Sequence, residues 1–291
     1  MSLLVIGANG FIGQAFVRQR QGGEIYTARR MISGEFVQFD PLTDELQTLN
    51  GISAISHALI LFAEREPDRC IKDPIGTARV NVELPCRIVD QCFALGITPV
   101  LASTELVFDG KSGMYVESAL PEPILEYGRQ KLATERYLLS SRAEGLILRF
   151  PKTVGLQRHD HSLFTTWIDK ILQGPKELTC AADQYFSLQL VDDVPAIVRS
   201  LAGHGMRGIV HVGDGRRHSR FDLLSQLCST LKAIDIDTPE LKKVSIHDFN
   251  LPEPRPLDVS MNSSVLTSLT GIYAEPIEEL ILRVTKEYCG T

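Results

Sequence analysis

A tyrosine and a lysine stand four positions apart, at Tyr127 and Lys131. On a helix this spacing puts both side chains on one face, so that the ammonium lies beneath the phenol. A cation in that place favours the phenolate and lowers the pKa of the tyrosine from about 10 toward the working range. Tyr127 could then donate a proton to a carbonyl that is reduced by hydride, while Thr104 hydrogen-bonds the same oxygen. We expect Thr104, Tyr127 and Lys131 to be the catalytic residues.

A glycine-rich turn near the start of the chain suits a nucleotide cofactor. It follows the apolar run 3–6 and opens a helical pattern. Gly7 permits a tight turn, Gly10 lets the backbone approach a pyrophosphate, and Gly13 lets the helix pack closely on the strand. The amide groups at the start of the helix then face the phosphates. The residues of this turn that we expect to bind a dinucleotide are Gly7, Asn9, Gly10, Phe11, Ile12 and Gly13.

The end of the second predicted strand, residues 24–28, indicates which dinucleotide binds. An NAD site places an Asp or Glu there for the ribose hydroxyl. This chain continues instead with Arg29 and Arg30. Two planar guanidiniums with no acid beside them can donate in pairs to a 2′-phosphate. We therefore expect NADP, with NAD possible, and the alternative is a pair of solvated surface arginines.

The elements that must position these residues alternate between short apolar runs and amphipathic stretches. Strands are expected at residues 3–6, 24–28, 58–62, 98–102 and 145–150, and helices at 11–20, 77–95 and 124–140. This alternation is typical of a parallel sheet that is covered on both faces. Pro99 indicates that the first residues of its strand are not fully paired. The sequence predicts an α/β fold, a Rossmann-type doubly wound parallel sheet with a smaller C-terminal substrate lobe.

The alternation weakens after Pro151, where segments rich in Pro, Gly and charge separate the elements. Helices are expected at residues 162–172, 191–201 and 221–231, with a final helix from about 276 to 288. We expect an NAD(P)-binding Rossmann domain over residues 1–150 and a substrate-binding lobe over residues 151–291, with some exchange of segments between them.

The composition narrows the classes of partner. The 291 residues carry 30 Lys and Arg against 36 Asp and Glu, a formal net charge of −6, which argues against bulk binding of nucleic acid or an anionic membrane. No stretch approaches the ~20 apolar residues that span a bilayer, and the first six residues lack the features of a signal peptide. Six scattered cysteines without a Cys-x-x-Cys pair are typical of a reduced protein. We expect a cytoplasmic protein without a metal, and a solvated loop at His159-Asp160-His161.

Two segments resemble the dTDP-4-dehydrorhamnose reductases, in the extended short-chain dehydrogenase/reductase (NAD-dependent epimerase/dehydratase) superfamily. Those reductases carry Ser-Thr-Asp-Tyr-Val-Phe-Asp-Gly, and this chain has Ser-Thr-Glu-Leu-Val-Phe-Asp-Gly at residues 103–110. They also carry Tyr-Gly-x-x-Lys-x-x-x-Glu, which residues 127–135 match. Nearly the whole chain is covered, including Asn81-Val82, Leu148-Arg149, Val191-Asp192-Asp193-Val194 and Arg255-Pro256.

The resemblance implies a nucleotide-sugar reductase in which Thr104, Tyr127 and Lys131 have the roles given above. It implies further that Asp40 lies where relatives hold the adenine and that Ala63 lies in the turn near the cofactor. Asp40 could equally cap a helix that begins near Leu42. A homodimer through the long helices is common among similar proteins.

This chain departs from the reductases where the sugar binds. Glu105 and Leu106 replace an Asp-Tyr pair, and Lys152 stands roughly where the reductases carry a sugar-stacking Trp. We expect Glu105, Lys152 and Arg255 to bind the substrate. Arg255 lies between two prolines and could meet a nucleotide diphosphate, or form a surface polyproline turn. Arg149 could pair with a buried acid or touch a phosphate, and Trp167 is expected in the core of its helix.

Proteins similar to these reductases also include dehydratases, epimerases and a regulatory subunit. Related dehydratases carry Thr-Asp-Glu at this place, and the second acid is missing after Glu105, which argues against elimination. Epimerases use the same tyrosine with a tightly held NAD, against which the arginine pair argues mildly. A regulatory subunit of methionine adenosyltransferase also resembles these reductases and keeps the Tyr and Lys. The charged turn Glu64-Arg65-Glu66 is slightly similar to that branch, so a non-catalytic dinucleotide-binding subunit is the alternative from another class.

Overall fold

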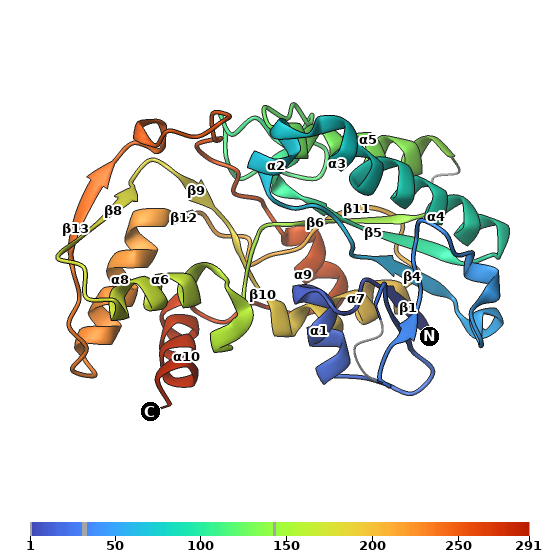
Figure 1. Ribbon diagram of the computed structural model, residues 1–291, viewed down its shortest axis with the longest axis horizontal. Coiled ribbons are helices and arrows are strands. Elements are labelled where there is room, and N and C mark those ends of the chain that lie inside the picture. Colours follow the sequence, from blue (N-terminus) through green and yellow to red (C-terminus); the bar gives the residue numbers. More distant parts are fainter. Residues whose placement is uncertain (1, 31–33, 142–143, 291) are drawn as a thin grey trace.

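The computed structural model describes residues 2–30, 34–141 and 144–290. Seven strands pair in parallel in the order β11-β6-β5-β4-β1-β2-β3 (Figure 1). They are β1 (Leu3–Ile6), β2 (Ile25–Ala28), β3 (Val37–Gln38), β4 (His57–Ile60), β5 (Thr98–Thr104), β6 (Leu146–Phe150) and β11 (Gly208–His211). The chain reverses its direction of travel across the sheet between β1 and β4, the switch point where ligands of such sheets bind. The predicted doubly wound α/β fold is confirmed.

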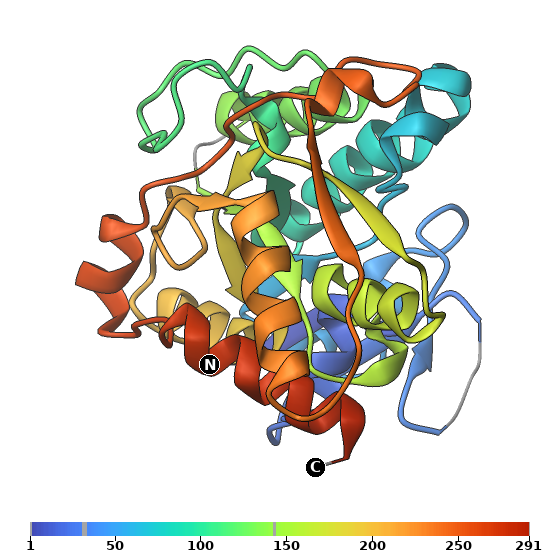
Figure 2. The ribbon, with the colours of Figure 1, turned by 90° about the vertical axis from the view of Figure 1, so that its left-hand side faces the viewer.

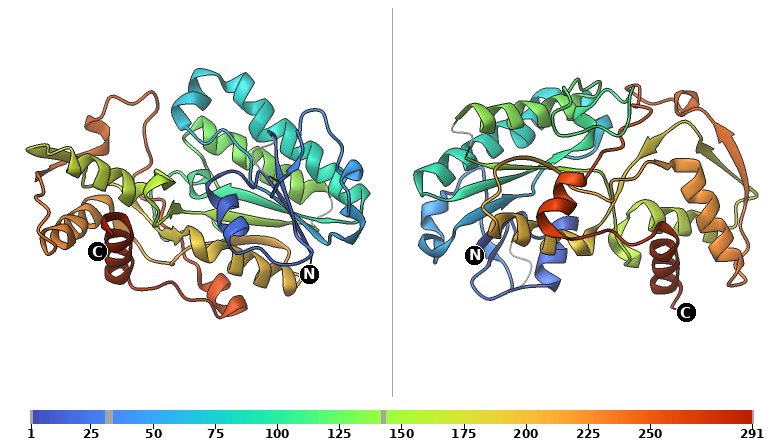
Figure 3. Two further views of the ribbon diagram at one scale, coloured as in Figure 1. Left: turned by 60° about the horizontal axis from the view of Figure 1, so that its bottom comes forward. Right: turned by 180° about the vertical axis from the view of Figure 1, so that it is seen from behind.

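Helices cover both faces of the sheet (Figures 1 and 3). On one face lie α1 (Phe11–Arg18), α7 (Val194–Gly203) and α9 (Ser264–Thr270), and on the other α4 (Leu84–Ala94) and α5 (Glu126–Ser141). Successive residues of β1 point to opposite faces, so Leu3 and Val5 pack toward α1 while Leu4 and Ile6 pack toward α4. This explains why the strand is an unbroken apolar run.

The helix predicted at 77–95 is present, but it is not α-helical throughout. The structure has α2 (Pro67–Lys72), α3 (Pro74–Ala78), a π-helical turn at Arg79–Glu83, and then α4. Pro85 has no N–H and therefore cannot donate to the carbonyl of Asn81 four residues earlier. That carbonyl instead accepts a hydrogen bond from the Thr134 hydroxyl of α5, at 2.8 Å. The interruption thus ties this region to the helix that carries Tyr127.

Several smaller expectations are also settled by the hydrogen bonds. No helix begins near Leu42. Asp40 instead closes a turn, because its carboxylate accepts the Leu42 N–H at 3.0 Å and its carbonyl accepts that of Asp44 at 2.9 Å. Pro99 pairs with β4 only, since the pairing of β5 with β6 starts at Val100, which confirms the expected partial pairing.

The rest of the chain forms a second lobe, which Figure 2 views face on. Helices α6 (Leu163–Leu172), α8 (Arg220–Lys232) and α10 (Ile277–Cys289) share one apolar core. Three two-stranded sheets accompany them: β7 (Lys152–Val154) with β10 (Leu188–Leu190), β9 (Tyr185–Phe186) with β12 (His218–Ser219), and β8 (Glu177–Ala181) with β13 (Glu240–Val244). Although α7, β11 and α9 follow residue 151, they pack with the large sheet. The domain boundary near residue 150 stays a prediction.

Among the described residues, no helix is long and apolar enough to cross a membrane.

Candidate active site

The glycine turn lies between β1 and α1, at the switch point of the sheet. Gly7 has a φ of +86°, which side chains rarely adopt, and its carbonyl accepts the Gly10 N–H at 3.0 Å. An added Cβ on Gly13 would lie 2.5 Å from the Cα of Ala8, so only glycine allows α1 to pack this closely on the turn. The structure therefore accounts for each of the three glycines by contact or conformation.

The turn fits the phosphates of a dinucleotide. Gly10 is the N-cap of α1, and no side chain caps the first-turn amides there. Asn9 and Gly10 are exposed, so these amides can be approached from solvent. Uncapped amides at a helix start, together with the helix dipole, bind anions. A Cβ on Gly7 would also meet the backbone nitrogen of Phe62 at 3.1 Å, which shows how closely the next strand end approaches.

The sequence suggested that no acid lies beside the arginine pair after β2. The structure places one there. The Nε of Arg29 donates to Asp40 at 3.0 Å, because the parallel pairing of β2 with β3 brings the two strand ends side by side. The side chain of Arg29 is nevertheless 67% exposed. Arg30 is exposed as well. Both guanidiniums are therefore accessible to a ligand at the edge of the sheet.

The turn after β4 is held by Asn81. The side chain of Asn81 accepts the Glu64 N–H at 2.8 Å and donates to the Glu64 carbonyl at 2.9 Å. It also donates to Gln130 of α5 at 2.7 Å. These hydrogen bonds hold the turn that contains Ala63 against α5. The turn is therefore well packed although it carries several charged residues.

The expected catalytic residues come from two elements that meet. Thr104 ends β5, and a 3₁₀ turn at Glu105–Val107 follows directly. Tyr127 and Lys131 lie in the first two turns of α5. An added Cβ on Gly128 would lie 2.1 Å from the carbonyl oxygen of Leu106, so the start of α5 rests directly on the 3₁₀ turn. Thr104 and Lys131 are buried and Tyr127 is partly exposed.

The pKa of Tyr127 runs opposite to the sequence expectation. Burial raises it, and the nearby Glu105 carboxylate raises it further. These effects outweigh any stabilisation of the phenolate by Lys131, whose own pKa burial lowers to about 8. The expected depression of the Tyr127 pKa is therefore wrong for the protein without bound ligands, and the phenol holds its proton.

A buried ion pair lies below Lys131. Glu135, four residues further along α5, accepts from Nε of Arg149 at 3.1 Å and from Nη2 at 2.7 Å. The hydroxyl of Ser103 also donates to Glu135. Of the two roles considered for Arg149, the pairing with a buried acid is confirmed. The Glu135 carboxylate partly offsets the effect of burial on the pKa of Lys131.

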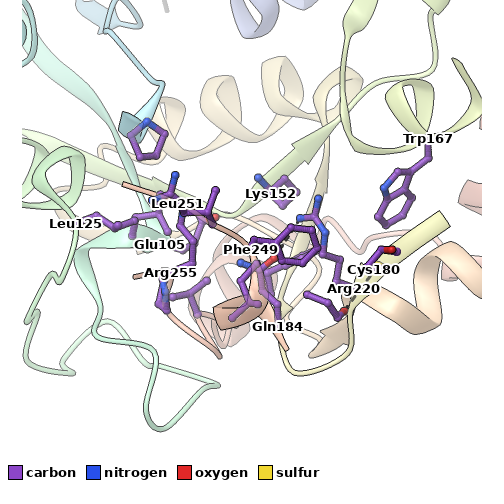
Figure 4. A pocket seen from close by; sticks show the side chains of 18 of the residues that line it. Glu105, Leu125, Lys152, Trp167, Cys180, Gln184, Arg220, Phe249, Leu251 and Arg255 are labelled. Atoms are coloured by element: carbon purple, nitrogen blue, oxygen red, sulfur yellow. Dashed lines mark hydrogen bonds between the residues drawn. The ribbon is translucent and has the colours of Figure 1, made fainter. Parts of the chain in front are cut away.

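A cavity of about 350 Å³ opens beside these residues, between the large sheet and the second lobe. Glu105, Lys152 and Arg255 all line it, as Figure 4 shows, so the structure brings together the three residues expected to bind substrate. Neither Tyr127 nor Thr104 lines it; the cavity begins at their neighbours Glu105, Leu106 and Leu125.

Lys152 and Glu105 are electrostatic partners in this cavity. Burial lowers the pKa of Lys152 and raises that of Glu105, and each charge partly offsets the burial of the other. Within the described part of the chain they form no ion pair within 4.0 Å, and Lys152 has no hydrogen bond from its ammonium. A buried ammonium needs acceptors. A polar ligand group in the cavity would supply them.

Sequence reasoning missed Arg220, which lines the other end of the cavity. Its guanidinium donates to Gln184 at 3.2 Å and lies 5.7 Å from the ring centre of Trp167 (Figure 4). Burial lowers the pKa of Arg220, and no carboxylate of the described residues forms an ion pair with it. Trp167 is buried in its helix as expected but also faces the cavity. No local pattern marks these residues, because the cavity is assembled from distant segments.

The doubly wound parallel sheet with a glycine turn at its switch point defines the class of Rossmann-type α/β proteins. Within this class, the chain belongs to the family described as the RmlD substrate binding domain, whose model matches residues 1–289. The resemblance found in the sequence is confirmed.

Reductases and a regulatory subunit are among the similar proteins. A probable low-salt glycan biosynthesis reductase of Haloferax volcanii is 26% identical over 275 residues, 89% of this chain and 90% of that protein. Methionine adenosyltransferase 2 subunit beta of Mus musculus is 23% identical over 282 residues, 92% of this chain and 82% of that protein. The crystal structure of a dTDP-4-dehydrorhamnose reductase from Bacillus anthracis, in complex with NADP, has a TM-score of 0.79 at 19% identity and covers all of both chains.

Proposed function

We propose that this protein is an NADP(H)-dependent reductase of a nucleotide-linked keto-sugar or a similar carbonyl, with NAD as a possible cofactor. The observation that carries the proposal is the position of the cationic cavity, which begins at Glu105 and Leu106, against the start of α5. A ligand in that cavity would present its carbonyl end to Tyr127 and Thr104. The similarity to a glycan biosynthesis reductase supports the same class of substrate.

NADP is favoured by the shape and charge of the cofactor site. The uncapped first turn of α1 suits the pyrophosphate, and the accessible guanidiniums of Arg29 and Arg30 suit a 2′-phosphate. The similarity to a reductase in complex with NADP points the same way. When bound, NADPH supplies the hydride that reduces the carbonyl.

Tyr127 would act as the general acid. Its raised pKa keeps the phenol protonated near neutral pH, so that a proton is ready for the oxygen of the carbonyl as the hydride arrives. Thr104 would orient that oxygen through its hydroxyl. Lys131, with a pKa of about 8, stays mostly charged at pH 7 and would steady the cofactor ribose.

The basic side chains of the cavity suit a nucleotide diphosphate. Lys152, Lys170, Arg220 and Arg255 line it together with one acid, Glu105. Arg255 pairs with Asp68, whereas Lys152 and the half-buried Arg220 form no ion pair with a carboxylate of the described residues. Guanidiniums bind phosphate oxygens in pairs. An acidic protein with a locally basic cavity therefore favours an anionic substrate.

The test is the oxidation of NADPH with dTDP-4-dehydrorhamnose as probe, followed at 340 nm beside a calorimetric titration with NADPH, NADH and dTDP. The proposal expects NADPH to bind more tightly than NADH, dTDP to bind, and turnover with the keto-sugar or a close analogue. Failure of dTDP and every nucleotide keto-sugar to bind would overturn it.

A second candidate is a cofactor-binding regulatory subunit, favoured by the similarity to methionine adenosyltransferase 2 subunit beta over 92% of this chain. Such a protein would bind NADPH yet reduce no sugar. It would also form a stable complex with a methionine adenosyltransferase catalytic subunit from the same organism. Size-exclusion chromatography of the mixed proteins, run beside the NADPH assay, separates the two candidates.

A further inference from the structure

Residues 249–256, here called the strap, run along the cavity. Phe249, Leu251, Arg255 and Pro256 of the strap line it. In Figure 2 the orange ribbon that leaves the upper end of β13 passes α2 and α5 in this stretch. We infer that Glu253 of the strap is a positioning residue, which couples occupancy of the cavity to the first turn of α5 and thereby to Tyr127. The inference rests on the proposed function.

Two side chains fasten the strap to the large-sheet part of the molecule. Glu253 accepts the backbone N–H of Glu126 at 2.9 Å and a guanidinium N–H of Arg129 at 3.2 Å. Arg255 pairs with Asp68 of α2 and donates to the carbonyl of Glu253 at 3.1 Å. Arg255 itself lines the cavity, so a ligand that moves it also moves the backbone of Glu253.

Glu253 caps the start of α5, which the residue directly before the helix does not cap. The first amides of a helix have no partner within the helix, and a polar side chain just before it normally accepts from one of them. The residue before α5 is Leu125, which cannot do so. Glu253 reaches this amide from 127 residues away in sequence. The residue it holds, Glu126, directly precedes Tyr127.

The close contact between α5 and the 3₁₀ turn links the cap to the position of Tyr127. Because a Cβ on Gly128 would lie 2.1 Å from the Leu106 oxygen, the first turn of α5 has no slack toward Thr104 and Glu105. A shift of that turn therefore changes the position of the Tyr127 phenol relative to Thr104. Misplacement by about 1 Å can cost on the order of a hundredfold in rate.

One carboxylate oxygen of Glu253 is buried without a partner. The residue is 5% exposed, yet its second oxygen, Oε2, has no hydrogen-bond partner among the described residues. A buried unsatisfied oxygen costs free energy, and a neutral side chain would avoid that cost. The strap thus retains a costly acceptor where Glu253 meets the helix of Tyr127.

The test compares three variants with the wild type. Glu253→Ala removes the cap, and Glu253→Gln keeps an oxygen that can accept the Glu126 N–H. Asp183→Ala is the matched control, because Asp183 accepts the Ile246 N–H at 2.7 Å just before the strap but does not contact α5. Amide hydrogen exchange is followed in peptides that cover residues 125–131 and 245–256, with and without dTDP. Steady-state kinetics use NADPH and dTDP-4-dehydrorhamnose.

In the wild type we expect dTDP to slow exchange in both peptides. In Glu253→Ala the exchange of residues 125–131 should be faster and should no longer respond to dTDP, and kcat should fall by roughly 10- to 100-fold while KM changes less than about threefold. Glu253→Gln should restore most of kcat. Asp183→Ala should affect only residues 245–256.

Unchanged exchange at residues 125–131 in Glu253→Ala, or an equal loss of kcat in Asp183→Ala, would overturn the inference. The proposed function fails by a different result, the absence of dTDP binding and turnover in the wild type. In that event the exchange of the ligand-free variants still decides whether Glu253 holds the start of α5.

Discussion

Arg149 and Glu135 form a two-pronged ion pair inside the protein, with nitrogen–oxygen distances of 2.7 and 3.1 Å. Both side chains are at most 2% exposed. Glu135 comes from the helix that carries Tyr127 and Lys131, and Arg149 comes from β6. The pair therefore ties the expected catalytic helix to the sheet from beneath.

Breaking this pair from one side should destabilise the protein strongly. Removal of one partner leaves an uncompensated buried charge, which costs about 3–5 kcal/mol. We expect that loss in the free energy of unfolding of Arg149→Leu, measured by urea denaturation. The double variant Arg149→Leu/Glu135→Leu should lose less than Arg149→Leu alone. A double variant that loses the sum of both single effects would show that the two charges do not interact.

The affinity for NADPH should depend on the protonation of Lys131. Burial lowers the pKa of Lys131 to about 8, and an anionic ligand favours the charged amine. The affinity should therefore fall as the pH rises through about 8, and Lys131→Met should abolish this dependence. By the same linkage the unfolded chain binds more protons at Lys131 between pH 8 and 10.5, so the wild type should gain stability relative to Lys131→Met as the pH rises there. Fluorescence titration measures the affinity; an identical pH profile in Lys131→Met would contradict the assignment.

Arg29→Ala should weaken NADPH binding by about tenfold and leave NADH binding nearly unchanged, because only NADPH carries a 2′-phosphate. Arg136→Ala is a suitable control, as Arg136 is an exposed arginine on α5 that we place in neither site. Calorimetric titration gives both affinities. Equal losses for the two cofactors would mean that Arg29 does not contact the 2′-phosphate.

Arg220→Met should weaken dTDP binding by roughly tenfold or more, because it removes a half-buried guanidinium that forms no ion pair with the described residues and can donate to phosphate oxygens in pairs. It should also leave NADPH binding unchanged, since Arg220 lies in the second lobe. Lys170→Met, which removes an exposed cation at the same cavity, should have a smaller effect. A loss in Lys170→Met as large as that in Arg220→Met would contradict the special role of Arg220.

The features of the fold that depend on near neighbours in the sequence were predicted well. The buried strands are apolar runs, and the glycine turn has a fixed spacing set by backbone contacts between near neighbours. The π-helical stretch inside the helix at 77–95 was missed, because Thr134, whose hydroxyl binds the freed carbonyl of Asn81, lies 53 residues away. Likewise, the acid beside Arg29 comes from the end of β3, which only the strand pairing brings near.

The residues of the candidate site could be proposed from the sequence, but their electrostatics could not. Motif order alone singled out Tyr127, Lys131 and Thr104 as expected catalytic residues, and their roles stay predictions. The pKa of Tyr127 could not be predicted in this way, because it depends on burial and on the carboxylate of Glu105 in three dimensions. Arg220 and Glu253 carry no local motif, and they matter only through a cavity and a helix start that distant segments build. The homodimer and the cytoplasmic location stay predictions.

In the proposed reaction Tyr127 donates a proton during hydride reduction. The most direct test of this step is kcat of Tyr127→Phe with NADPH and dTDP-4-dehydrorhamnose, with NADPH affinity measured on the same sample. We predict a fall in kcat of roughly a hundredfold or more, the size of a lost general acid, while the NADPH dissociation constant changes less than about twofold. An unchanged kcat would contradict the account.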